Sequence, residues 1–194
     1  YNSLSDEEKL ALLSGITETA DTGLIENPVF ADTLKVMTSV HTIQNQNGQE
    51  GCNRYIISQC NSALNAMEVY GLFLLSGWKK EELNVDIVPL FETIDDLTNA
   101  AAVMQQLYNT KSYREHLKKR SSRQTIMLGF SDGTKDGGYM MANWSIYKAK
   151  EELTAISRQY GIDVLFFDGR GGPPSRGGGK THKFYASMGH NIEN

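Results

Sequence analysis

The sequence of 194 residues predicts an α/β fold in which about four parallel strands alternate with helices. Short apolar runs rich in β-branched residues recur along the chain, a polar break follows each run, and a segment with helical spacing follows each break. Strands connected through helices pair in parallel by right-handed crossovers. Four strands are half the number in a (β/α)8 TIM-type barrel, so the pattern alone fits either an open α/β sheet or part of a barrel.

The expected elements follow from local signals. Ser5 is a suitable N-cap for a helix over residues 5–14, and Asn27-Pro28 opens a second helix that runs towards Gln46. Strands are expected at residues 54–58, 85–91, 124–130 and 162–167. One helix is expected after the first strand and ends near residue 75. Further helices are expected over about 93–108, 109–119, 136–160 and 182–188. We therefore expect one domain fragment over residues 1–194, with a helical lead-in over 1–50 and β/α units over 51–194.

Composition excludes several classes of function. The net charge of −4 disfavours a nucleic-acid-binding surface. No apolar run approaches the length of a membrane span, so we expect no membrane partner. The two cysteines, Cys52 and Cys60, are too few for a disulfide scaffold and match no zinc spacing, which indicates a reducing, cytoplasmic location.

Two acidic residues follow neighbouring predicted strands. Glu92 comes directly after the second strand and Asp132 just after the third, at the carboxyl ends where α/β folds place their ligand sites. Two carboxylates from adjacent strands can hold a hard cation such as Mg²⁺, which keeps several waters and takes further oxygens from a substrate. The alternative is that each acid caps a helix or interacts with its dipole.

A cationic, glycine-rich loop follows the fourth strand. Residues 169–179 contain Arg170 and Arg176, Lys180 and Lys183 come next, and no acid interrupts them. Glycines let backbone amides approach an anion, and arginines bind phosphate or carboxylate through two hydrogen bonds. Glycine also predicts a mobile loop, and a flexible linker is the alternative reading. Lys135, at the expected start of a helix, is a further candidate for an anion contact, against a solvated surface lysine.

Three ordered motifs together resemble phosphoenolpyruvate carboxylase. They are Val88-Pro-Leu-Phe-Glu-Thr-Ile-Asp-Asp-Leu97, Gly129-Phe-Ser-Asp-Gly-Thr-Lys-Asp-Gly-Gly138, and Phe167-Asp-Gly-Arg-Gly-Gly172 with Arg176-Gly-Gly-Gly179. The resemblance covers about residues 54–189, and residues 1–50 match loosely. It implies that the fold is part of the carboxylase's (β/α)8 barrel. It also implies that the parent enzyme, typically a cytoplasmic homotetramer, converts phosphoenolpyruvate and bicarbonate to oxaloacetate and phosphate.

The resemblance also assigns roles to individual residues. Glu92 and Asp132 would be the ligands of Mg²⁺ or Mn²⁺. The substrate phosphate would meet Arg170 with Gly171 and Gly172, and bicarbonate or carboxyphosphate would meet Arg176. Lys135 would add positive charge beside the metal. The apolar wall beside the substrate methylene would be formed by Leu90 and Met127.

The chain departs from the family pattern in two respects. Asp168 stands where the family commonly has histidine, which questions any proton-handling role there. The family's upstream Thr-x-His-Pro segment and its downstream arginines are not among these 194 residues, so we expect the fragment alone to be inactive. The alternatives are another magnesium-dependent phosphoenolpyruvate-type barrel enzyme, which would not share the doubled Gly-Gly loop, and a non-catalytic anion-binding module.

Overall fold

The computed structural model describes residues 1–192. Its seven α-helices, in that part of the chain, are α1 (Asp6–Gly15), α2 (Pro28–Asn47), α3 (Ala63–Leu75), α4 (Ile94–Asn109), α5 (Lys111–Lys119), α6 (Phe130–Gln159) and α7 (Thr181–Ala186). The strands are β1 (Arg54–Ile57), β2 (Asp86–Phe91), β3 (Arg123–Gly129) and β4 (Asp163–Gly169). Two 3₁₀ turns, η1 (Thr22–Leu24) and η2 (Pro174–Arg176), complete the order. No helix of the described residues is long and apolar enough to cross a bilayer.

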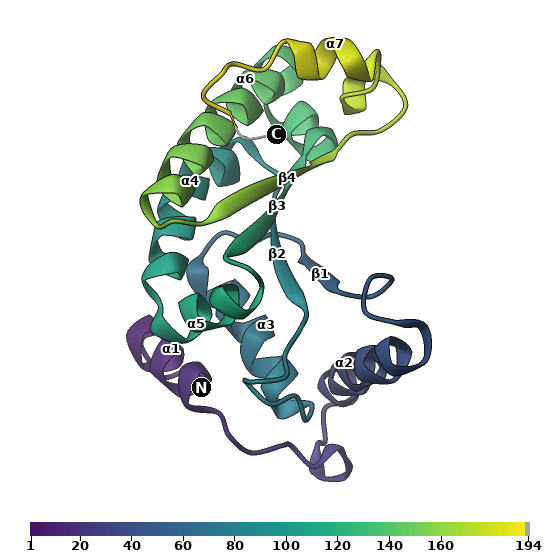
Figure 1. Cartoon of the computed structure of the whole chain (residues 1–194), viewed down its shortest axis with the longest axis vertical. Coiled ribbons are helices and arrows are strands. Elements are labelled where there is room, and N and C mark those ends of the chain that lie inside the picture. The colour runs from purple at the N-terminus through teal and green to yellow at the C-terminus, as the bar shows by residue number, and fades with distance from the viewer. Residues whose placement is uncertain (193–194) are drawn as a thin grey trace. The chain divides into compact units, whose positions relative to one another are not determined.

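The four strands form one sheet in the order β1-β2-β3-β4 (Figure 1). β3 pairs in parallel with both β2 and β4. The predicted fold class is therefore confirmed: parallel strands alternate with helices in an α/β fold. That the sheet belongs to a closed barrel stays a prediction.

The chain forms two compact units, and the first comprises residues 1–55 and 64–87. Helices α1, α2 and α3 build its core. Trp78 is buried there, with its indole nitrogen donating to the Met37 carbonyl at 3.1 Å. Gly71 of α3 lies against Leu13 of α1, because a Cβ at Gly71 would come within 2.6 Å of the Leu13 side chain. The expected helical lead-in is thus packed against α3, and the prediction of a single domain fragment stays open.

The second unit comprises residues 56–63 and 88–194, of which the structure describes those to 192. Here α6 packs against α4 and β4. The contact faces of α4 and α6 are apolar, and they bury Ala100, Val103, Met104, Leu107, Ala142, Ile146, Ala149 and Leu153. Between α4 and α6, the Tyr108 hydroxyl lies 3.0 Å from that of Ser157, and between α5 and β3, the Tyr113 hydroxyl donates to Gln124 at 2.9 Å. This packing supports β3 and β4.

One boundary differs from the prediction in a way that affects the site. The expected helix over 136–160 begins at Phe130, so Asp132 and Lys135 belong to the helix and do not precede it. A break at Gly138, with φ 79°, separates a short first segment from the long remainder. The three glycines between residues 133 and 138 weaken the helical signal, which explains why the first segment is missed.

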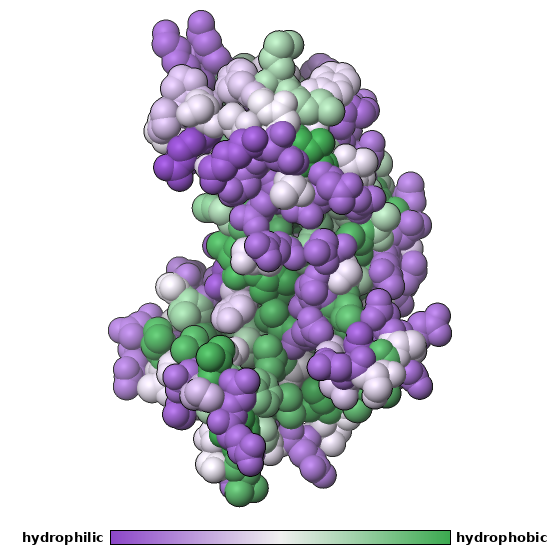
Figure 2. All heavy atoms as spheres, turned by 180° about the vertical axis from the view of Figure 1, so that it is seen from behind, coloured by the Kyte–Doolittle hydropathy of each residue, from purple (hydrophilic) through white to green (hydrophobic). Residues whose placement is uncertain are grey.

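Apolar side chains also lie on the surface, where Figure 2 shows them in green among polar ones. On α2, Val29, Val36 and Ile43 repeat every seven residues and are exposed, while the opposite face of the helix is buried. Such a stripe is typical of a helix face that packs against another element.

Candidate functional site

The strand register brings the candidate residues to one edge of the sheet. Phe91 pairs with Leu128, and Leu128 pairs with Asp168, so the residues that follow these strands are neighbours. A Cβ at Gly129 would lie 3.3 Å from the Cα of Glu92, and one at Gly169 would lie 2.9 Å from the Leu128 carbonyl. The backbone ends of β2, β3 and β4 therefore approach closely, as the predicted site requires.

Glu92 is held by the chain before α3. Its Oε2 accepts the backbone N–H of Gln59 at 3.0 Å, and Gln59 has a positive φ of 52°, which is uncommon outside glycine. The N-terminus of α4 is capped by other groups: Thr93 is the N-cap, and Asp96 accepts the amides of Glu92 and Thr93. The carboxylate of Glu92 therefore does not cap α4, and its role as a metal ligand stays a prediction.

Asp132 lies in the first turn of α6, where a carboxylate also suits the helix dipole. Lys135 Nζ lies 2.7 Å from its Oδ1, and the two side chains are 72% and 47% exposed for Lys135 and Asp132 respectively. An exposed ion pair of this kind contributes about 0–1 kcal/mol, so a cation can displace Lys135 at small cost. A lysine near a helix N-terminus is disfavoured by the helix dipole, and the ion pair with Asp132 accounts for Lys135 there without a bound ligand.

The carboxylates of Glu92 and Asp132 offer oxygen ligands, the type that hard divalent cations take. Residues 1–192 contain no group of three or more His, Cys, Asp or Glu placed to hold a metal ion. Mg²⁺ is commonly bound through one or two carboxylates and completed by water and substrate oxygens. That Glu92 and Asp132 are the protein ligands of such an ion stays a prediction.

Leu90 and Met127 form an apolar surface beside this edge. They are register partners on β2 and β3, and Leu90 is buried. The Met127 methyl group reaches Gly169, because a Cβ there would lie 3.0 Å from it. The sequence prediction of an apolar wall thus corresponds to two adjacent side chains at the start of the glycine-rich loop.

The glycine-rich loop folds back on itself. The amide of Gly171 donates to the Arg176 carbonyl at 2.6 Å, and the amides of Arg176 and Gly178 both donate to the Pro173 carbonyl at 3.0 Å. Gly177, with φ 78°, lies against the Phe130 ring, where a Cβ would come within 2.5 Å. The linker reading does not predict such closure, and movement of the loop on ligand binding stays a prediction.

The two arginines of the loop have different surroundings. Arg170 is half-buried; its Nε donates to the Gly177 carbonyl at 2.5 Å, and its guanidinium carbon lies 4.0 Å from the centroid of the Phe184 ring. Arg176 is exposed, and its side chain lies over Gly171. Arg170 is therefore held in place, whereas Arg176 is available to solvent and ligands. Gly172, between them, is exposed.

Sequence reasoning missed a buried ion pair beneath the loop. Lys150 Nζ lies 2.7 Å from Oδ1 and 2.9 Å from Oδ2 of Asp168, and both side chains are 2% exposed. Burial lowers the pKa of Lys150, and Asp168 opposes that effect. The sequence did contain a signal that Lys150 is buried. Lys150 comes four residues after Ile146 and three before Leu153, so it lies on the apolar face of α6.

Gly177→Ala is expected to open the loop, because alanine disfavours the positive φ and its Cβ would collide with Phe130. Hydrogen exchange at the amides of Gly171 and Gly178 should accelerate by about tenfold or more. Gly161→Ala is the matched control, since Gly161 has φ 66° but open space around it. Equal exchange in both variants would contradict the proposed Phe130 contact.

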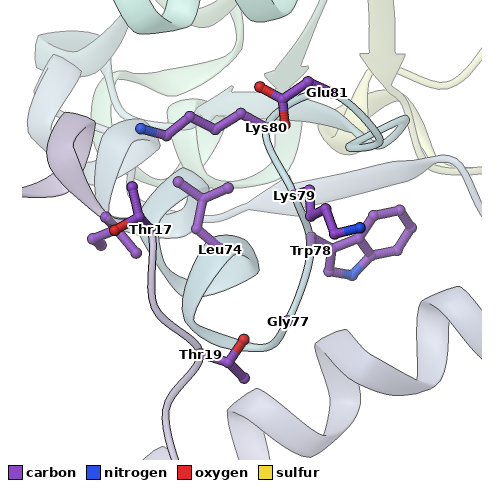
Figure 3. A pocket seen from close by; sticks show the side chains of 9 residues that line it. Thr17, Thr19, Leu74, Gly77, Trp78, Lys79, Lys80 and Glu81 are labelled. Carbon is purple, nitrogen blue, oxygen red and sulfur yellow. The ribbon is translucent and has the colours of Figure 1, made fainter.

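The pocket drawn in Figure 3 is not this site. Its volume is about 390 Å³, and it is lined in the first unit by Thr17, Thr19, Leu74, Gly77, Trp78 and neighbouring residues. Both of its lysines have partners: Lys80 Nζ donates to the Ser14 carbonyl at 2.7 Å, and Lys79 pairs with Glu82 at 3.4 Å. None of the candidate residues lines it.

Comparison with known proteins identifies the family of this chain. The family model for phosphoenolpyruvate carboxylase matches residues 1–188, which includes the lead-in that the motifs did not cover. Relatives include the phosphoenolpyruvate carboxylases of Nitrosomonas eutropha, 39% identical over 154 residues, and Nitrosomonas europaea, 40% identical over 154 residues. Each alignment covers 77% of this chain and 16% of the relative, so the chain spans a small part of their length. The chain belongs to the phosphoenolpyruvate carboxylase family.

Proposed function

We propose that this chain supplies the metal ligands and the anion-binding loop of an enzyme that carboxylates phosphoenolpyruvate with bicarbonate, giving oxaloacetate and phosphate. The observation that carries the proposal is the meeting of Glu92, the Leu90 and Met127 surface and the arginine loop at one sheet edge. A carboxylate, an apolar wall and two arginines are what a substrate with a phosphate, a carboxylate and a methylene group needs.

Glu92 and Asp132 would hold a Mg²⁺ or Mn²⁺ ion, which when bound would polarise the substrate and stabilise negative charge. The Gln59 amide keeps the Glu92 carboxylate at the strand end before any cation arrives. Lys135 would leave Asp132 when the ion binds and would add its charge beside the substrate. The exchange of one cation for another keeps Asp132 neutralised in both states.

Arg170 would bind the phosphate, and Arg176 would bind bicarbonate or the carboxyphosphate that forms from it. The stacking of Arg170 on Phe184 and its bond to Gly177 fix its orientation before substrate binds. The amide of Gly172 lies in the same loop and can approach the anion closely because glycine has no side chain. Leu90 and Met127 would exclude water from the substrate methylene and so protect the reactive carbon from protonation.

The longer enzyme would be a cytoplasmic homotetramer, by resemblance to its family. A different phosphoenolpyruvate-type barrel is disfavoured because the doubled Gly-Gly loop is part of the matched region. The non-catalytic reading applies best to the 194-residue chain by itself, since it spans 16% of the length of its relatives.

The chain alone is therefore expected to form no measurable oxaloacetate. Groups that act together in catalysis are strongly non-additive, so an incomplete set does not leave a modest residual rate. The test supplies the purified chain with Mg²⁺, phosphoenolpyruvate and bicarbonate, with the full-length enzyme assayed in parallel. Robust turnover by the chain would show that these residues suffice.

A further inference from the structure

The ion pair between Lys150 and Asp168 lies inside a cage of aromatic rings. Lys150 Nζ is 5.3 Å from the ring centroid of Phe166, 5.4 Å from that of Phe184 and 5.9 Å from that of Tyr185. These rings come from β4 and α7, and Lys150 comes from α6. Three separate elements thus meet at one buried charge pair.

Tyr185 and Phe184 connect this pair to the glycine-rich loop. The Tyr185 hydroxyl donates to Asp168 Oδ2 at 3.1 Å. The guanidinium carbon of Arg170 lies 4.0 Å from the centroid of the adjacent Phe184 ring. The Phe184 ring also contacts the Phe130 ring edge-on, with 5.8 Å between the centroids. The position of α7, and through it the position of Arg170, therefore depends on Asp168.

Charged groups surround the contact between Asp168 and Tyr185. Asp168 attracts the Lys150 ammonium and Arg170 repels it. Burial and the Asp168 carboxylate raise the pKa of the Tyr185 hydroxyl, and Arg170 opposes this effect. Lys150 takes both oxygens of that carboxylate. Lys150 on α6 and the Tyr185 hydroxyl on α7 thus hold the Asp168 carboxylate from two elements.

We propose that Asp168 and Lys150, with Tyr185 and Phe184, form a positioning unit that holds the Arg170 guanidinium ready for the substrate phosphate. Asp168 is a positioning residue in this unit and does not transfer a proton. This inference rests on the proposed function, because it assigns the anion at Arg170 to phosphoenolpyruvate.

The test is a double-mutant cycle in the full-length enzyme. Asp168→Asn leaves Lys150 buried without its counter-charge, and Lys150→Met leaves Asp168 likewise, so each single variant should raise the KM for phosphoenolpyruvate by about tenfold or more. The double variant removes both charges and should return KM to within about threefold of the wild type. The shape of the kcat/KM profile against pH should not change in the double variant.

Tyr185→Phe provides a milder variant that should fold whatever the single charge variants do. It removes only the hydroxyl on Asp168 and should raise the KM for phosphoenolpyruvate about threefold. Tyr160→Phe is its matched control, since the Tyr160 hydroxyl donates to Asn109 at 2.9 Å, outside the cage, and its loss should leave KM unchanged.

Three outcomes would overturn the proposal. The first is a double variant whose KM for phosphoenolpyruvate is as high as that of the single variants, and the second is the loss of one limb of the double variant's pH profile. The third is lower thermal stability of the variants with an unchanged KM. The first two would return a proton-transfer role to Asp168, and the third would make the pair a stabilising element only. If the wild-type enzyme forms no oxaloacetate, the proposed function itself fails, which the wild-type assay shows separately.

Discussion

Glu92→Gln in the full-length enzyme is expected to lower turnover by about a hundredfold and to raise the Mg²⁺ concentration needed for half-maximal activity by about tenfold or more. The substitution keeps the shape of the side chain and removes its charge. Glu92 and Asp132 are the two protein carboxylates proposed for the ion, so loss of either charge removes half of the protein's anionic ligands. Asp132→Asn should behave in the same way. Activity titrated with Mg²⁺ measures both effects.

Asp95→Asn is the matched control for these variants. Asp95 is an exposed carboxylate in the first turn of α4, three residues after Glu92, so its loss changes the local charge by the same amount. Its Mg²⁺ requirement should equal that of the wild type. Wild-type metal affinity and turnover in both Glu92→Gln and Asp132→Asn would remove the metal assignment and leave Asp132 as a first-turn dipole partner.

Arg176→Ala is expected to slow oxaloacetate formation by about a hundredfold while changing the KM for phosphoenolpyruvate much less. Arg176 is exposed at the end of η2, and its backbone closes the loop through the Gly171 amide, so the alanine variant keeps the loop fold. Its proposed partner is the bicarbonate-derived group, whose charge changes during the reaction. Phosphate release should therefore fall less than oxaloacetate formation, which uncouples the two half-reactions.

Lys180→Ala separates a specific contact from general electrostatics. Lys180 is exposed and follows the same loop, so its loss removes an equal charge from the same positive region. The ratio of oxaloacetate to phosphate should remain at the wild-type value in this control. An unchanged ratio at an unchanged rate in Arg176→Ala itself would exclude Arg176 from the mechanism.

Local chemistry accounts for most of what was predicted correctly. Ser5 and Asn27 accept the amides of their own first helical turns, and such caps depend on residues two or three positions apart. The apolar runs became strands at nearly the expected bounds because a buried parallel strand is read from composition alone. The start of α6 was missed because its glycines have low helix propensity. There, Gly133 and Gly137 allow the helix to approach Glu92 and Ile94 closely.

In the candidate site, too, some features follow from local sequence and others from tertiary packing. The sequence by itself determined which residue types follow each strand, so Glu92, Asp132 and the arginine loop could be named as candidates without a structure. Only the tertiary structure decided that Asp96 and Thr93 cap α4 in place of Glu92, and that Lys135 pairs with Asp132. It alone decided that Lys150 is buried against Asp168, eighteen residues further along the chain. Burial and charge pairing of this kind depend on which elements pack together, and that packing is a property of the whole fold.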